Sequence, residues 1–232
     1  MFKTLCALGL AAIAATGHAH QIWIEQPAGE PPVLRFGEFA ENLREASPGL
    51  LDVFGKPTAV LVAGQAATSV PLAKGPSGFT LAARPAPGEA LVAEDAAFPL
   101  RKTADAMSWY RPGARHATGW AAQPGRLALD IVPGGSSGAV QVFYQGQPLP
   151  KAKVAIAVPS GWGREAVTDA QGRARFDLPW QGDYVIEVSH IDCTPGEREG
   201  QRYDNIHYVT TLHVTQTEGL PPIPAGPPAK PH

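Results

Sequence analysis

Glycine and proline constrain this chain more than any other residues: 25 glycines and 24 prolines are spread along its 232 residues. Both residues destabilise the interior of a helix and favour tight turns. The stretches between them are short and either apolar or alternating, as in residues 21–26, 58–63 and 205–214. Such stretches are typical of β-strands. We therefore expect an all-β fold made of two antiparallel β-sandwich domains.

A glycine- and serine-rich joint at residues 134–138 separates the two expected domains. The first covers residues 20–133 and the second residues 139–215. In the second, Tyr184, Ile186 and Val188 occupy alternate positions, as on a strand with one buried face. The proline-rich segment 216–232 is expected to be extended and disordered.

One short helix is expected in the first domain, in the run RFGEFAENLREASPG of residues 35–49. Helical spacing would place Phe36, Phe39 and Leu43 on one face, and the proline at position 48 would end the helix. A second face would carry the carboxylates of Glu38, Glu41 and Glu45. Such a face is either an ordinary solvated surface or a cluster that attracts a cation.

Residues 1–19 have the organisation of a secretory signal peptide. A basic start at Lys3 is followed by a short apolar segment and then by small residues up to Ala19. Cleavage there would export a protein that begins with His20, and no segment reaches the ~20 apolar residues of a membrane span. We therefore expect a periplasmic protein without a membrane anchor, in which Cys193 is the one remaining cysteine and closes no internal disulfide.

Charge and motifs exclude two classes of function. The formal net charge is −2, and loss of Lys3 makes it more negative, so the clustered positive charge of a nucleic-acid-binding protein is missing. Ser160 lacks the Gly-x-Ser-x-Gly frame of a hydrolase nucleophile, and nothing near Cys193 indicates a lowered thiol pKa. We expect no enzymatic activity.

Two resemblances refine the fold and the function. The stretches GQPLPKAKV and TDAQGRARFDLPWQGDYVIEV, framed by Thr168, Gly172, Phe176 and Tyr184, resemble the prealbumin-like modules of collagen-adhesin B repeats and carboxypeptidase regulatory domains. The stretches AHQIWIE, FGEFAENLREASPGLLDVF and TPGEREGQRYDNIHYVTTL resemble a bacterial periplasmic family of unknown function. Members of that family are often assigned to nickel or cobalt uptake, which implies a role in metal transport.

Histidines are the candidate metal ligands, although the chain lacks the local spacing of a zinc or nickel motif. Cleavage would give His20 two donors, its imidazole and an α-amino group with a pKa of about 7.7–8.0. With a third nitrogen these would form a copper site of the histidine-brace type. The candidate partners are His207, His190 and His116, in that order. An antiparallel pairing would bring His190 beside His207, and His116 lies in an expected loop.

Two functions remain open from the sequence. The first is a periplasmic metal-binding or metal-delivery protein for nickel, cobalt, copper or iron, working beside a membrane transporter or an outer-membrane receptor; copper and nickel suit nitrogen donors best. The second is a metal-free binding module for a polymer, a siderophore or a partner protein. A groove that combines the tryptophans would favour the second function: Trp109, Trp120, Trp162 and Trp180.

Overall fold

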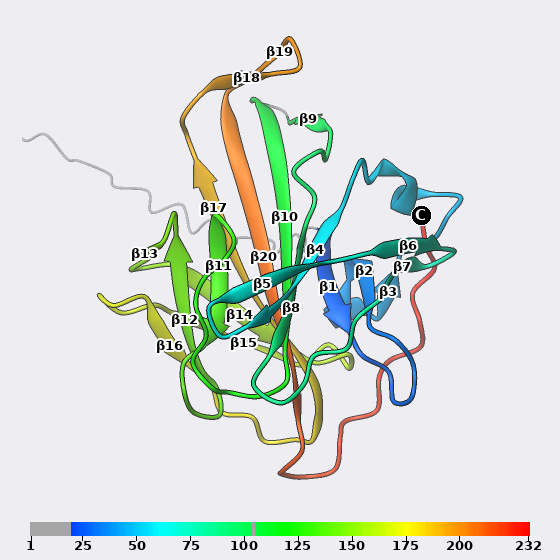
Figure 1. Ribbon diagram of the computed structural model, residues 1–232, viewed down its shortest axis with the longest axis vertical. Coiled ribbons are helices and arrows are strands. Elements are labelled where there is room, and N and C mark those ends of the chain that lie inside the picture. The colour runs from blue at the N-terminus through cyan, green and yellow to red at the C-terminus, as the bar shows by residue number, and fades with distance from the viewer. Residues whose placement is uncertain (1–19, 104) are drawn as a thin grey trace, which may run out of the picture.

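The computed structural model describes residues 20–103 and 105–232, so the expected signal peptide at 1–19 lies outside the described residues. The described chain consists of short strands and turns, with two 3-10 helices, η1 (Phe39–Glu41) and η2 (Leu50–Val53). The expected all-β, sandwich-like fold is confirmed (Figure 1). No helix within these ranges is long and apolar enough to cross a membrane.

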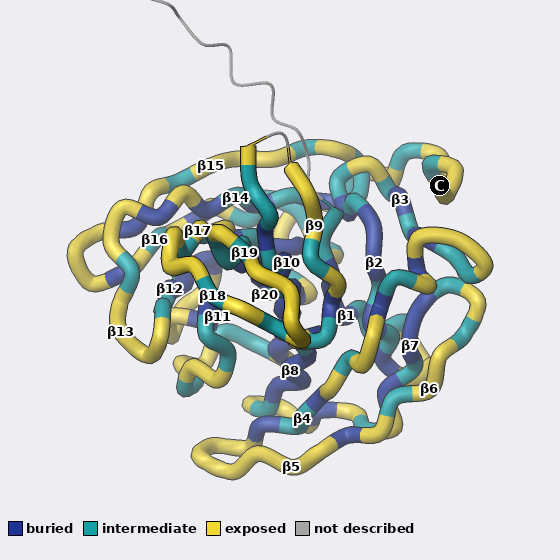
Figure 2. Tube along the Cα trace, turned by 90° about the horizontal axis from the view of Figure 1, so that it is seen from above, coloured by how far each residue is buried: buried dark blue, intermediate teal, exposed yellow. Residues whose placement is uncertain are grey.

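A nine-stranded sheet forms the centre of the molecule, and its strands come from both halves of the chain (Figure 1). Its order is β15-β14-β17-β20-β10-β8-β4-β5, with β9 pairing with β10. The strands are β4 (Thr58–Ala63), β5 (Ala66–Val70), β8 (Ala90–Glu94), β9 (Leu100–Lys102), β10 (Met107–Ala117), β14 (Lys153–Ala157), β15 (Gly163–Val167), β17 (Gly182–Asp192) and β20 (Asn205–Gln216). Figure 2 shows that β5 and β15, at the margins of this sheet, are largely exposed.

The two halves meet at the ladder between β10 and β20. These strands run parallel, with Ser108 paired with Asn205 and His116 paired with His213. The other strand ladders among the described residues are antiparallel. Pro112 interrupts β10 where its antiparallel partner changes from β9 to β8. A residue without an N–H is tolerated there because that edge of the strand is between partners.

Smaller sheets cover the two faces of the central sheet. One contains β1 (Gln21–Glu25), β2 (Val33–Glu38), β3 (Leu43–Arg44), β6 (Leu72–Gly75) and β7 (Gly78–Leu81). The other contains β11 (Leu129–Pro133), β12 (Ala139–Tyr144), β13 (Gln147–Pro148) and β16 (Arg173–Arg175). A separate hairpin is formed by β18 (Gly196–Arg198) and β19 (Gln201–Tyr203). In β20, Val209 faces the core under the first sheet, whereas Tyr208 and Leu212 face the core under the second.

The expected joint at residues 134–138 therefore separates the residues of two hydrophobic cores, but it does not separate two sheets. The first core is formed mainly by residues before the joint and the second mainly by residues after it. Both cores share the central sheet, because β20 lies between β17 and β10. The sequence does not reveal this sharing, since a parallel ladder between distant strands has no local signature.

The expected helix at residues 35–49 is wrong. This segment forms β2, the single turn η1 and the short strand β3, and Phe36 and Leu43 are buried from strands instead of from one helical face. Gly37 explains the difference: at φ 147°, a Cβ atom there would lie 2.2 Å from the carbonyl oxygen of Leu43. The backbone of β3 thus passes close to β2 because this position has no side chain.

The proline-rich segment 217–232 follows a defined path, contrary to the expected disorder. It leaves β20 at the bottom of Figure 1 and runs along the outside of the molecule to the neighbourhood of β3. Leu220 forms a bridge with Trp180, and Ala229 forms one with Leu43. The side-chain amide of Asn42 donates to the carbonyl of Gly226 at 2.7 Å. These contacts bring His232 to the first sheet.

Candidate metal site

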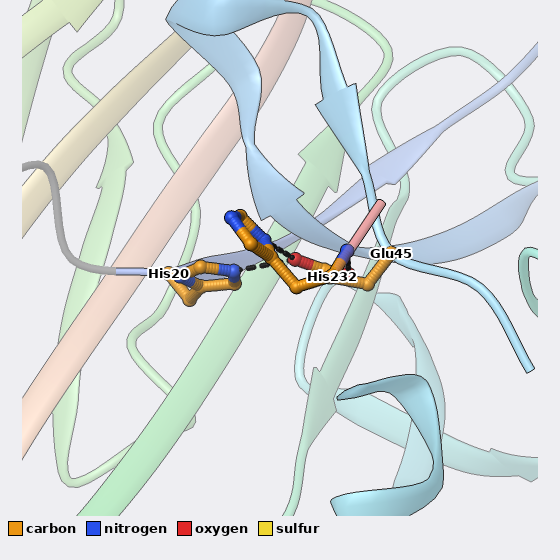
Figure 3. Close-up of side chains that lie close together, drawn as sticks. All are labelled: His20, Glu45 and His232. Atoms are coloured by element: carbon orange, nitrogen blue, oxygen red, sulfur yellow. Dashed lines mark hydrogen bonds and ion pairs between the residues drawn. The ribbon is translucent and has the colours of Figure 1, made fainter. Parts of the chain in front are cut away.

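Three side chains from distant parts of the chain meet beside β1: His20, Glu45 and His232 (Figure 3). The Nε2 atom of His20 lies 2.6 Å from Oε1 of Glu45, and the Nδ1 atom of His232 lies 2.8 Å from the same oxygen. One donor atom from each residue lies within 4.8 Å of the others. Among the described residues, this cluster is a group of three His, Cys, Asp or Glu side chains that lie close enough together to hold one ion.

Backbone contacts fix the position of each ligand. The hydroxyl of Tyr110 donates to the carbonyl of His20 at 2.6 Å and so ties the start of β1 to the central sheet. The amide of Glu45, directly after β3, donates to the carbonyl of Phe36 at 2.8 Å. The amide of His232 donates to Oε2 of Glu45 at 2.9 Å. The site is therefore formed by the start of β1, the end of β3 and the extended tail.

Gly49 makes room for the tail. Its φ is 151°, and a Cβ atom at this position would lie 2.8 Å from the carbonyl oxygen of His232. A larger residue would push the backbone of His232 away from Glu45. The close approach of the tail thus depends on the lack of a side chain at Gly49.

Glu45 is the electrostatic centre of the cluster. Its side chain is fully buried, whereas the side chains of His20 and His232 are 21% and 61% exposed. Burial raises the pKa of the Glu45 carboxyl, but hydrogen bonds from His232 and His20 outweigh this effect, so its pKa lies below the usual value. Glu45 is therefore ionised at neutral pH. A second carboxylate, from Glu38, lies 3.3 Å from Nδ1 of His20.

This arrangement can bind a divalent cation. It offers two imidazole nitrogens and a buried anionic oxygen, the donor set that suits copper, nickel and zinc. The exposed side of His232 leaves room for water or another ligand to complete the coordination. Glu38 can hold the second ring nitrogen of His20, as the outer partners of metal-bound histidines commonly do.

The predicted partners of His20 lie elsewhere. His190 pairs with Tyr208, and Ile191 pairs with His207. Because side chains alternate along a strand, this register places His190 and His207 on opposite faces of the sheet. His207 instead contacts Ser189 through Nε2 at 2.8 Å. The predicted pair of His190 and His207 is therefore wrong.

His116 lies near the end of β10 and not in the expected loop. Its Nδ1 is 2.8 Å from Nδ1 of His213, and both rings are buried. Burial, with a smaller contribution from His213, lowers the pKa of His116 to about 3. Burial also lowers the pKa of His213, against the opposing charges of Asp183 and Glu25. Both imidazoles are therefore neutral at physiological pH.

The candidate list from the sequence missed Glu45, His232 and the pairing of His116 with His213. Glu45 had a signal, since it belongs to the row of carboxylates noted above. His232 had none, because only the path of the tail brings it to His20. The pairing of His116 with His213 depends on the parallel ladder and had no signal either.

The tryptophans do not share a groove. Trp162 and Trp180 stack edge to face with ring centres 4.8 Å apart, and Trp120 and Trp162 pack against the second core. Trp109 instead contacts the guanidinium groups of Arg111 and Arg198, whose Cζ atoms lie 4.8 and 5.3 Å from the centre of its ring. No feature of these tryptophans in the described structure favours the metal-free binding function.

Comparison with known proteins gives one match. The family model described as a domain of unknown function (DUF4198) matches residues 112–192, which include most of β10 and all of β17. No curated protein and no solved structure matches the chain. The match relates this segment to a family of unknown function, and none of the residues of the His20 cluster lies within it. The function of the protein is therefore inferred from the geometry of the site.

Proposed function

We propose that the protein binds a divalent transition-metal ion, copper or nickel, in the periplasm and delivers it to a membrane transporter or an outer-membrane receptor. The observation that carries this proposal is the convergence of two imidazoles on a buried, ionised carboxylate within 4.8 Å. The periplasmic location rests on the signal-peptide-like organisation of residues 1–19.

The geometry favours His20 Nε2, His232 Nδ1 and a Glu45 oxygen as the ligands. In a histidine brace the amino-terminal residue binds through its α-amino group and Nδ1, but Nδ1 of His20 faces Glu38. Nε2 faces Glu45 and His232 instead. In this arrangement the free amine that cleavage would create is not a ligand, so the proposed site differs from the brace expected from the sequence.

Calorimetric titration with nickel(II) and copper(II) tests the proposal, using protein that begins at His20. His20→Ala, Glu45→Gln and His232→Ala should each weaken binding by at least about 100-fold, since loss of a ligand costs more than loss of an outer partner. His190→Ala and His207→Ala are the matched controls and should bind as the unmodified protein does. Equal affinity across all five variants would refute the site.

A form with one extra residue before His20 separates the two coordination modes. The proposed site predicts unchanged affinity, because the added residue blocks only the amine. A large loss of affinity would establish the brace in its place. Elemental analysis of protein isolated gently from periplasm would then identify the metal that is bound in the cell.

A further inference from the structure

The pairing of His116 with His213 is a second place where two imidazoles converge, and it is independent of the cluster at His20. The two residues are directly opposite each other in the parallel ladder, so their side chains leave the sheet on the same face. Their neighbours on that face are Leu91 on one side and Val185 on the other. The rings are 5% and 1% exposed. This is a buried environment with apolar neighbours in both adjacent strands.

The protonation of the pair is defined by its geometry. The two Nδ1 atoms are 2.8 Å apart, so one of them donates a hydrogen to the other. Both rings are neutral, since a charged imidazolium would be costly at such a buried position. The Nδ1–H of one ring therefore donates to the lone pair on Nδ1 of the other, and the donor ring keeps a free lone pair on Nε2.

A polar atom of the pair is left without a partner. Nε2 of His213 is buried and has no hydrogen-bond partner among the described residues. Oδ1 of Asp183 lies 3.6 Å from this nitrogen, which is too long for a hydrogen bond. The same oxygen accepts a hydrogen bond from the hydroxyl of Thr215 at 2.7 Å, which fixes its position. The carboxylate of Asp183 therefore lies near Nε2 of His213, the ring nitrogen that faces away from His116. Metal-binding histidines usually have an outer partner at this position.

We infer that His116 and His213 form a two-coordinate site for a soft monovalent metal ion, copper(I) or its analogue silver(I), bound between the two Nδ1 atoms. Two neutral nitrogen donors facing each other match the linear coordination that these ions adopt. A divalent ion would keep its full charge in an apolar interior with no carboxylate among its ligands, at a high desolvation cost. A single positive charge is balanced more easily by the nearby Asp183.

The binding step balances without any other reactant. The ion replaces the hydrogen between the two Nδ1 atoms, and the displaced proton is taken up at the free Nε2 of the same ring. Both rings then carry their hydrogen on Nε2, and that of His213 points toward Asp183. Two metal–nitrogen bonds of about 2 Å require the Nδ1 atoms to lie about 4 Å apart, so the rings must separate by about 1 Å.

Anaerobic titration with copper(I) in competition with bicinchoninate tests the inference. The exposed thiol of Cys193 also binds copper(I), so the experiment uses a Cys193→Ser background. We expect one copper(I) per chain to be withheld from the competitor. His116→Gln and His213→Gln should each abolish this retention, and the matched pair His20→Ala and Glu45→Gln should not change it. No retained copper(I), or retention that is lost only in the His20 and Glu45 variants, would overturn the inference.

Silver(I) added to the unmodified protein gives a second test, read by nuclear magnetic resonance, that does not depend on the stability of the variants. Nitrogen-15 spectra of the histidine rings should show both His116 and His213 changing to the form with hydrogen on Nε2, with metal-induced shifts at their Nδ1 atoms. Shifts confined to other histidines would overturn the inference. Nickel(II) binding to His116→Gln should equal that of the unmodified chain, so failure of this site can be distinguished from failure of the site at His20.

Discussion

The two histidine sites use the same side chain in opposite surroundings. At His20, a buried ionised carboxylate stands between two partly exposed imidazoles that come from distant segments. At His116 and His213, two buried neutral rings face each other across one parallel ladder, and the nearest carboxylate lies behind them. The difference teaches that local charge and exposure to solvent, more than the number of histidines, lead to different proposals: a divalent ion beside the ionised carboxylate and a monovalent ion between the neutral rings.

The largest expected effect concerns the first site when it is loaded. Nickel(II) at 100 times its dissociation constant should raise the free energy of unfolding by about 2.7 kcal/mol, because it binds only the folded chain. His232→Ala should lose this gain, and His213→Gln should keep its full size. Chemical denaturation with and without nickel(II) measures the difference. A gain that persists in His232→Ala would mean that nickel(II) binds elsewhere, and the proposed site at His20 would be wrong.

Next in size is the effect of breaking the buried pair. His213→Leu should lower the free energy of unfolding by about 1–3 kcal/mol, because it leaves Nδ1 of His116 buried without a partner. The double variant His116→Leu/His213→Leu should cost less than the sum of the two single changes, since it removes both polar groups. Urea unfolding of the four proteins gives the coupling. Strict additivity would mean that the two rings do not depend on each other.

A smaller effect should appear with pH. The pKa of His116 is lowered to about 3 by burial and by the neighbouring His213, whereas in the unfolded chain a histidine takes up a proton below about 6.5. Stability from this group is therefore complete above pH 6.5 and lost as the pH falls, at up to about 1.4 kcal/mol per pH unit. The charges that act on the pair are Asp183 and Glu25, both through His213.

Unfolding measured between pH 6.5 and 5 tests this slope. Most carboxylates remain ionised there, and Glu187, whose pKa burial raises to about 7, is present in both proteins of the comparison. The variant that lacks both buried histidines should show a flatter profile than the unmodified protein. An identical slope in the two proteins would show that the buried pair does not contribute to the pH dependence.

The smallest effect is expected at the first site when it is empty. His232→Ala should change the free energy of unfolding by less than about 0.5 kcal/mol without metal, since its ring is 61% exposed and the buried Glu45 keeps its contacts with His20 and with the backbone amide at position 232. Thermal unfolding in a chelator-treated buffer measures it. A loss as large as that of His213→Leu would mean that the tail stabilises the fold even without an ion.

The sequence predicts most of the strands, but little of how they come together. Alternation identified the strand at Tyr184–Val188 correctly, because burial of one face leaves a period of two in the sequence. The strand at 58–63 was predicted correctly from its short apolar run. The prediction of a helix at 35–49 was wrong because the spacing of Phe36 and Leu43 fits a helix and a pair of strands equally well. Gly37 allows the strands β2 and β3 to approach each other closely.

The candidate site shows the same limit. His20 was identified because its position after the signal-like segment is a local feature of the sequence. Its partner His232 is brought to it by the contacts of Asn42 with Gly226 and of Leu43 with Ala229, and the pairing of His116 with His213 requires the register of a parallel ladder. These are long-range arrangements, which neither spacing nor composition records.

The parallel ladder between β10 and β20 also determines when the protein can fold. Paired residues such as Ser108 and Asn205 are 97 positions apart, so closing this ladder requires a large loss of chain entropy before any contact compensates for it. Because β20 lies at the centre of the shared sheet, neither core can be completed until residues 205–216 are available. A chain that emerges from a membrane pore with its amino end first would stay largely unfolded until this stretch arrives, and would then fold in a single late step.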